Sequence, residues 1–145
     1  FDGFGAGGVS NLLDDYEEGT FTPSFAYGLV GSAYESNGQK GAYTKIGRYV
    51  YGTILLHLQT ASTQDGNVID IHGLPFTPIN HTNGQGGGLN NFYQDGFFNA
   101  NDFSGIVKSA SAQVRLYVKA TGAYLTGSSV NAGREIRCNF WYHAA

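Results

Sequence analysis

The chain has little of several features that would define its function. There is one cysteine, Cys138, in a run of alternating apolar residues, so no internal disulfide can form and we expect a small buried side chain rather than a reactive thiol. Charged residues make up 13% of the chain, about half of the usual ~25%, and no segment concentrates lysine and arginine. This distribution predicts no nucleic-acid partner. No apolar run approaches the roughly 18 residues that span a bilayer, which predicts no membrane insertion.

Methionine is absent, including from position 1, so we expect the chain to be a piece of a longer polypeptide. Six acidic residues precede the first basic residue, Lys40, and four glycines fall within residues 1–10. This acidic, glycine-rich start predicts an arm or linker over residues 1–18. The remaining residues, 19–145, are enough for one domain with its own core.

Glycine and aromatic residues are abundant, with 22 Gly, 10 Tyr and 10 Phe. The clearest structural signal is the run 48–58, which alternates with a period of two and predicts a β-strand. One face carries aliphatic side chains, at Val50, Ile54, Leu56 and Leu58. The other carries Tyr49, Tyr51, Thr53 and His57. This second face is too apolar to be wholly exposed, so we expect another sheet or another copy of the chain to cover it.

Further short strands are expected along the chain, at 20–25, 68–72, 89–98, 114–118 and 134–142. Glycine, asparagine and polar residues predict loops at 27–40 and 81–88, and Asp95-Gly96 is a hairpin signal if its flanking strands pair. Pro23 predicts an edge position for its strand. Eight or nine short strands with almost no helical periodicity indicate an all-β sandwich or barrel.

The four histidines raise the question of a metal site, but His57, His72, His81 and His143 lack the spacing of a zinc motif. We therefore expect no metal within one chain. If three copies met on an axis, one histidine from each, either His57 or His143, could ligate an ion.

The remaining catalytic signals are equally weak. The adjacent carboxylates at 14–15 and 17–18 have no flanking apolar pocket, so a solvated acidic face is favoured over an acid/base pair. Ser128-Ser129 lacks the Gly-x-Ser-x-Gly elbow, and the glycine-rich segment 84–88 lacks the Lys-Ser/Thr ending of a phosphate loop. We expect neither a catalytic residue nor a cofactor, and hence no enzyme.

Three segments, in the order in which they occur, resemble a known family: LDDYEEGTFTP at 13–23, GAYTKIG at 41–47 and GLPF at 73–76. The chain is similar to the C-terminal domains of bacteriophage tail-fibre, head-fibre and other virion appendage proteins, although that family often has Trp where this chain has Phe21. The segments 114–118 and 136–142 look like the closing strands of trimeric jelly rolls of the complement-C1q and tumour-necrosis-factor type. The resemblance implies an antiparallel jelly-roll-like β-sandwich that forms a parallel homotrimer on a virion, outside the cell.

The leading hypothesis is a structural virion protein, the distal or C-terminal module of a tail or head fibre that attaches to a bacterial surface protein or glycan. An alternative is a domain that decorates or braces the capsid or tail and has no host ligand. A third is a carbohydrate-binding or depolymerase-associated module, with Trp141 and Tyr93 stacking on sugar rings. In the first two hypotheses the N-terminal segment joins the domain to other virion structural proteins.

Candidate residues follow from the low-charge loops and from the aromatic strand faces. The expected receptor contacts are Tyr27, Tyr34, Asn37, Asn83, Gln85, Asn90, Asn91 and Tyr93. The expected trimer-interface residues are Tyr49, Tyr51, His57 and Trp141.

Overall fold

The computed structural model describes residues 15–29, 31–61, 65–80, 86–99 and 102–145, with Asn91 described in its backbone alone. This part of the chain contains nine strands and one short 3₁₀ helix, η1 (Gly127–Ser129). The strands are β1 (Tyr16–Phe21), β2 (Ser24–Tyr27), β3 (Ala33–Ile46), β4 (Tyr49–Thr60), β5 (Ile69–His72), β6 (Gly87–Gln94), β7 (Phe103–Val107), β8 (Gln113–Val118) and β9 (Arg134–His143). No helix among the described residues has the length and apolarity needed to cross a bilayer.

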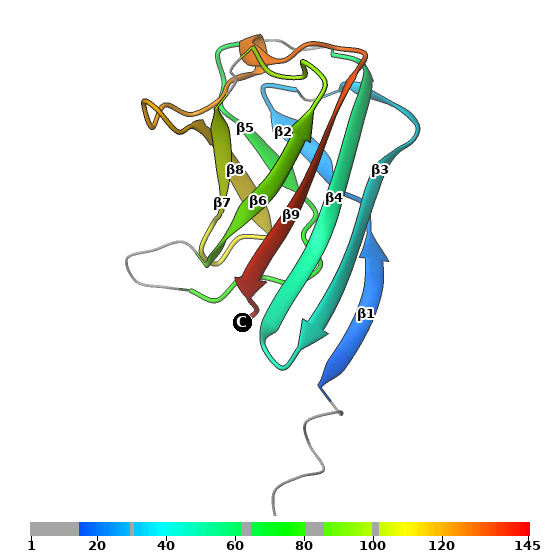
Figure 1. Ribbon diagram of the computed structural model, residues 1–145, viewed down its shortest axis with the longest axis vertical. Helices are drawn as coiled ribbons and strands as arrows, with labels where there is room; N and C mark the ends of the chain where they lie inside the picture. The colour runs from blue at the N-terminus through cyan, green and yellow to red at the C-terminus, as the bar shows by residue number, and fades with distance from the viewer. Residues whose placement is uncertain (1–14, 30, 62–64, 81–85, 100–101) are drawn as a thin grey trace, which may run out of the picture.

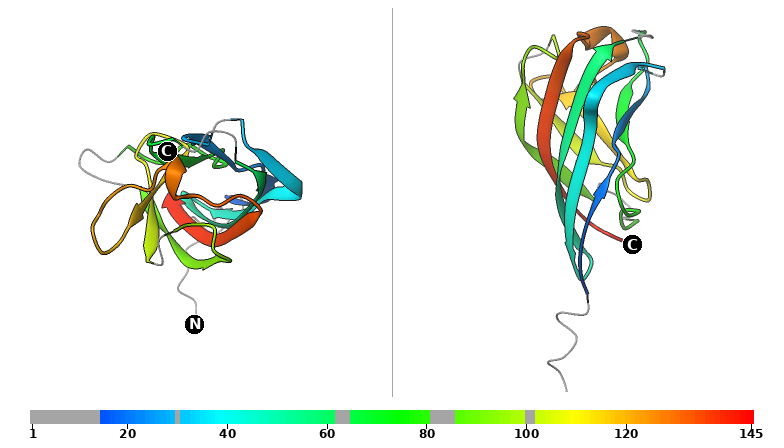
Figure 2. Two further views of the ribbon diagram at one scale, coloured as in Figure 1. Left: turned by 90° about the horizontal axis from the view of Figure 1, so that it is seen from above. Right: turned by 90° about the vertical axis from the view of Figure 1, so that its right-hand side faces the viewer.

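All nine strands belong to one antiparallel sheet in the order β1-β3-β4-β9-β6-β7-β8-β5-β2. The sheet curls on itself, so that β1, β3, β4, β9 and β6 form a larger layer and β7, β8, β5 and β2 form a smaller layer (Figures 1 and 2). The predicted all-β, antiparallel, jelly-roll-like sandwich is confirmed. The homotrimer stays a prediction.

The core lies between the layers and follows the predicted alternation. On β4, the even-numbered Val50, Ile54, Leu56 and Leu58 are at most 1% exposed. On β9, the side chains that meet them are also buried, at Ile136, Cys138, Phe140 and Tyr142. The smaller layer closes the core with Ile69, Ile71, Val107, Val114 and Leu116. Full burial of each such aliphatic side chain stabilises the fold by about 1.5–3 kcal/mol.

Two glycines make room for aromatic rings in the larger layer. A Cβ at Gly41 would lie 2.4 Å from the Phe21 ring, and a Cβ at Gly52 would lie 2.5 Å from the Phe140 ring. The two rings meet edge to face, with centroids 5.6 Å apart. Phe21 therefore fills the space beside β1 as an aromatic plug.

The predicted loop at 27–40 is wrong for most of its length, because β3 begins at Ala33. The register of β3 against β4 shifts between Tyr34 and Gln39, where Asn37 has a φ of +62° and Gly38 is buried. A β-bulge uses the asparagine and glycine that suggested a loop. Asn and Gly serve a bulge as well as a turn, which is why composition alone misplaced the element.

Two further local predictions are corrected by strand pairing. Gly87 and Gly88 were expected in a loop but begin β6, where a Cβ at Gly87 would lie 1.9 Å from the Trp141 carbonyl oxygen. Asp95-Gly96 does turn the chain, with Gly96 at φ +91°, but the residues directly after the turn do not pair with β6, which pairs with β9 and, at its first two residues, with β7. Phe98, which follows the turn, instead bridges to Val130.

The two ends of the sandwich have different roles. The first strand, β1, starts at the same end as the turn between β3 and β4 and the C-terminus (Figure 1). This end is called the N-terminal end below, and the opposite one the far end. The sheet begins at Tyr16, so residues 16–18 of the expected arm are strand.

Candidate functional site

The outer face of the larger layer, which points away from the core, contains the predicted interface residues. Alternation places the odd-numbered residues of β4 and β9 on this face, and the register aligns them with their neighbours on β3 and β1. The outer face is therefore a set of rows that run across the strands, each formed by residues distant in sequence.

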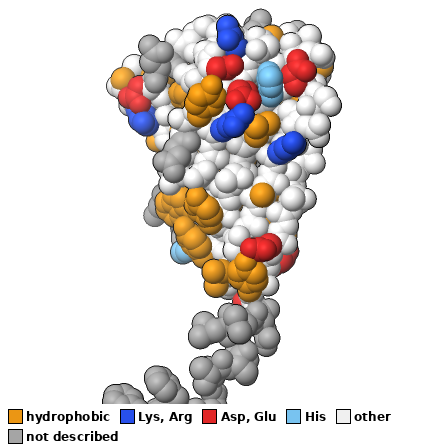
Figure 3. Space-filling model, turned by 45° about the vertical axis from the view of Figure 1, so that its right-hand side comes forward, with side chains coloured by type: hydrophobic (Ala, Val, Ile, Leu, Met, Phe, Trp, Pro, Cys, Tyr) orange, Lys and Arg blue, Asp and Glu red, His pale blue; other side chains and the backbone are white. Residues whose placement is uncertain are grey.

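Two rows at the N-terminal end form an exposed apolar cluster, called the end patch. In the first row, Tyr16 pairs with Ile46 and Ile46 pairs with Tyr49. In the second row, Tyr51 pairs with Trp141. The five side chains are 40–54% exposed, and they are five of the eight exposed large hydrophobic residues among those described. Hydrophobic side chains gather at this end of the molecule (Figure 3).

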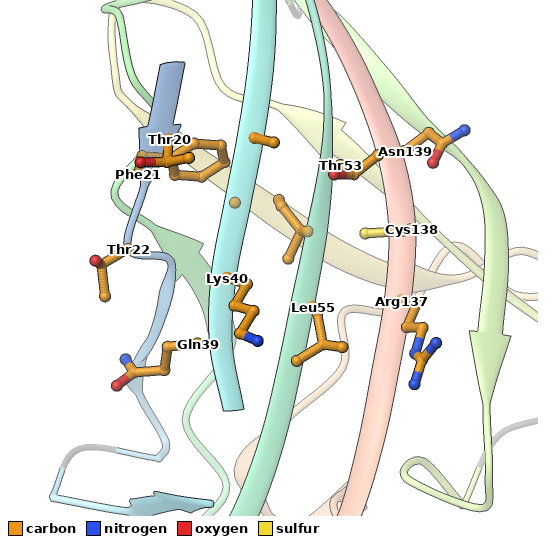
Figure 4. A pocket seen from close by; sticks show the side chains of 13 residues that line it. Thr20, Phe21, Thr22, Gln39, Lys40, Thr53, Leu55, Arg137, Cys138 and Asn139 are labelled. Carbon is orange, nitrogen blue, oxygen red and sulfur yellow. The ribbon is translucent and has the colours of Figure 1, made fainter. Parts of the chain in front are cut away.

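The next row consists of short side chains and forms the floor of a groove. Thr20 pairs with Ala42, Ala42 with Thr53, and Thr53 with Asn139. Longer side chains stand on both sides of this row, at Tyr51 and Trp141 on one side and at Lys40, Leu55 and Arg137 on the other. The difference in side-chain length leaves a hollow of about 620 Å³, lined by Thr20–Thr22, Gln39–Ala42, Thr53–Leu55 and Arg137–Asn139 (Figure 4).

The charge at the groove is set by two cations two strands apart. Lys40 on β3 and Arg137 on β9 flank Leu55 on β4. No carboxylate of the described residues lies within ion-pair distance of Lys40. Arg137 is positioned by a 2.9 Å ion pair with Glu135 and by the Tyr93 ring, whose centroid is 5.9 Å from the guanidinium carbon. The rim is therefore positive near Lys40 and partly neutralised near Arg137.

The acidic pair at 17–18 is divided between the two faces of β1, because successive strand residues point to opposite sides. Tyr43 donates a hydrogen bond to Glu17, and Tyr16 donates one to Glu18. These bonds raise the pKa of both tyrosines, the hydrogen bond being the largest cause and desolvation the next. Both carboxylates are exposed, and the strand keeps them apart.

The histidines are spread over the molecule. His57 lies on β4 toward the far end of the sandwich, with Nδ1 3.9 Å from Glu135 Oε2. His143, the last residue of β9, is exposed at the N-terminal end of the sandwich. His72 is on β5 in the smaller layer, and His81 lies outside the described residues. Within the described part of the chain, no group of three or more His, Cys, Asp and Glu is arranged to hold a metal ion.

Of the expected interface residues, Tyr49, Tyr51 and Trp141 come together in the end patch. His57 is separate from them, six residues beyond Tyr51 on the same strand, or roughly 20 Å away at the usual rise per residue. The patch also contains Tyr16 and Ile46, which the sequence did not indicate. These two residues join the patch because residues 16–21 pair with residues 41–46, and alternation within one strand does not reveal this pairing.

The expected receptor contacts occupy different settings. Tyr27 and Asn37 are exposed, both with positive φ, and Tyr93 is exposed on the outer face near Arg137. Asn90 is exposed on β6, where it pairs with Asn139. Tyr34 is half-buried, and its hydroxyl accepts a 2.6 Å hydrogen bond from the Phe25 amide, which is a packing role. Asn83 and Gln85 lie outside the described residues, and Asn91 is described in its backbone only.

Comparison with known proteins gave no assignment: no family model matches the chain, and no curated protein matches it significantly. The proposals below therefore depend on the residues of this chain and on their geometry.

Proposed function

We propose that the chain is a structural virion protein, the C-terminal module of a phage tail or head fibre, which assembles as a parallel homotrimer and attaches to the host surface. The three sequence segments described above motivate this proposal. The antiparallel jelly-roll-like fold is compatible with it. Under this proposal the protein is located on the virion, outside the cell, and performs no catalysis.

The observation that carries the proposal is the end patch. A tryptophan, three tyrosines and an isoleucine stand together on a sheet face, each 40–54% exposed. Contiguous apolar patches of this kind on soluble proteins mark interaction sites. Tyrosine and tryptophan are also the residues that most often dominate the energy of protein interfaces. A second and a third copy of the chain are the occupants that we propose.

The position of the patch favours a parallel arrangement. It lies at the end where β1 begins, so three copies joined there would have their N-terminal segments side by side. A single fibre shaft could then continue into all three. The far end, with Tyr27 and Asn37, would point away from the shaft toward the host surface. Three weak sites on one tip would bind a repetitive surface with an avidity about 10²–10⁴ above that of a single site.

Light scattering after size-exclusion chromatography tests the assembly. We expect a mass near three times 15.5 kDa at micromolar concentration. Replacing Tyr51 and Trp141 together with Glu should give a folded monomer, because charges would face apolar surface on the sister subunits. The control is Tyr93→Glu, which changes an exposed tyrosine outside the patch and should leave the trimer intact. A monomeric wild-type protein would overturn the proposal.

A second experiment separates host attachment from decoration of the particle. Fluorescently labelled protein should bind to cells of a susceptible bacterium and compete with phage adsorption. If the protein is incorporated into particles but binds no cells and does not slow adsorption, the bracing role replaces the attachment role.

A further inference from the structure

The groove on the outer face has the size and lining of a small-ligand site. Its volume of about 620 Å³ is within the range of roughly 300–1,000 Å³ that is typical of such sites. Its floor offers two hydroxyl groups and an amide, from Thr20 on β1, Thr53 on β4 and Asn139 on β9. A floor of hydroxyls and amides matches a ligand with many hydroxyl groups of its own.

The cationic rim of the groove favours a ligand with negatively charged groups. Lys40 has no carboxylate partner among the described residues, whereas Glu135, 2.9 Å from Arg137, neutralises part of that cation's charge. The two cations are two strands apart, or roughly 10 Å at the usual strand spacing. Between them lies the apolar side chain of Leu55 (Figure 4). This arrangement would hold negative groups at both cations while an apolar ring face lies over Leu55.

An exposed aromatic ring stands next to the cationic rim of the groove. Tyr93 on β6 pairs with Arg137 on β9, and its ring centroid is 5.9 Å from the guanidinium carbon. Rigid rings with a polar edge provide stacking surface at low entropic cost. From the hydroxyl-bearing floor, the cationic rim and the neighbouring Tyr93 ring together, we infer that the groove binds an acidic oligosaccharide, with its carboxylates at Lys40 and Arg137.

The inference names the ligand class of the proposed attachment function and rests on that function for the biological source of the ligand, a bacterial surface glycan. The end patch and the groove are different rows of the face, and they can be tested separately. Mass measurement reports on the patch, and ligand titration reports on the groove. Failure of one does not imply failure of the other.

Calorimetric titration of the full chain with trigalacturonic acid provides the test, with its fully methyl-esterified form as the matched neutral ligand. We expect millimolar or tighter binding of the acid and at least tenfold weaker binding of the ester. Lys40→Gln and Arg137→Gln should each weaken binding of the acid at least fivefold. Amide NMR signals of Thr20, Thr53 and Asn139 should shift on titration.

The control variant is Lys119→Gln, which removes an exposed lysine from outside the groove, paired with Asp102 at 3.0 Å. It should bind the acid as the wild type does, and unchanged circular dichroism will show that all variants are folded. Citrate, a carboxylate without a sugar, should bind at least tenfold more weakly than the trisaccharide. The inference is wrong if the acid and the ester bind with equal affinity, or if no binding of the acid occurs up to 10 mM. It is also wrong if Lys119→Gln weakens binding as much as Lys40→Gln does, or if citrate binds as tightly as the trisaccharide.

Discussion

Replacing Arg115 with Met should destabilise the fold strongly, because it leaves a buried carboxylate without its main partner. Asp70 on β5 is fully buried, although it points away from the core side occupied by Ile69 and Ile71. Arg115, opposite it on β8, donates two hydrogen bonds of 2.8 Å, from Nε to Oδ1 and from Nη2 to Oδ2. Lys108 lies 3.4 Å from the same carboxylate. The carboxylate is therefore satisfied chiefly by one guanidinium.

The expected magnitude follows from this geometry. Hydrogen bonds to charged groups contribute about 1.5–3 kcal/mol each, and removing one partner of a buried pair costs about 3–5 kcal/mol. Methionine retains much of the apolar stem of Arg115, so the loss should come from the Asp70 charge, left with Lys108 alone at 3.4 Å, rather than from a cavity. With a urea dependence of about 1–3 kcal/mol per molar, the unfolding midpoint should fall by roughly 2 M.

Equilibrium urea unfolding, followed by tryptophan fluorescence and circular dichroism, measures this change. The matched control is Lys119→Met, which removes the cation of an exposed ion pair with Asp102 on the same layer and should change stability by less than about 1 kcal/mol. The double variant Asp70→Leu with Arg115→Met should recover much of the loss, because it removes both charges. Equal effects of Arg115→Met and Lys119→Met would refute the reasoning.

Three further predictions concern other parts of the structure. Burial, the largest cause, lowers the pKa of His72 from 6.5. The contribution of His72 to the unfolding free energy is therefore fully present above pH 6.5 and is lost on acidification. Urea titrations at pH 7.5 and 5 should show this loss in the wild type and in His143→Gln but not in His72→Gln. Burial raises the pKa of the Cys138 thiol to about 12, so a thiol reagent at pH 8 should label unfolded protein and not folded protein. Gly52→Ala should lower the free energy of unfolding in urea by about 1–3 kcal/mol, because the new Cβ would lie 2.3 Å from the Ala42 carbonyl oxygen. The control Gly66→Ala places its Cβ with nothing within 4 Å and should leave the free energy of unfolding nearly unchanged.

The strands with regular alternation could be predicted from the sequence because their side-chain period is two. The runs that became β4, β8 and β9 carry their buried residues at every second position, and the structure buries those residues. Where composition was the guide, the prediction failed, as it did for β3. Asparagine and glycine near residue 37 indicated a loop, yet the strand continues through a bulge. Asparagine and glycine allow a positive φ, which suits both a turn and a bulge. Pairing with β4 makes this segment a bulged strand rather than a loop.

The candidate site was harder to predict because it depends on register between distant segments. Tyr51 and Trp141 are adjacent across β4 and β9 although 90 positions separate them in the chain. Alternation gives the face of each residue but not its neighbour in the next strand. The aromatic residues of the patch were therefore recognised on β4 and β9, whereas Tyr16 and Ile46 were not.

The groove shows the same dependence in a stronger form. Its floor is a row of four short side chains, Thr20, Ala42, Thr53 and Asn139, none of which is unusual within its own strand. A shift of β9 by two residues would place Trp141 or Arg137 beside Thr53 and fill the hollow, while the buried face would still be apolar. The core alone therefore does not determine the groove. It depends on the pairing of β4 with β9, which the aromatic contact of Phe21 with Phe140 and the close approach of Phe140 to Gly52 restrict to a single register.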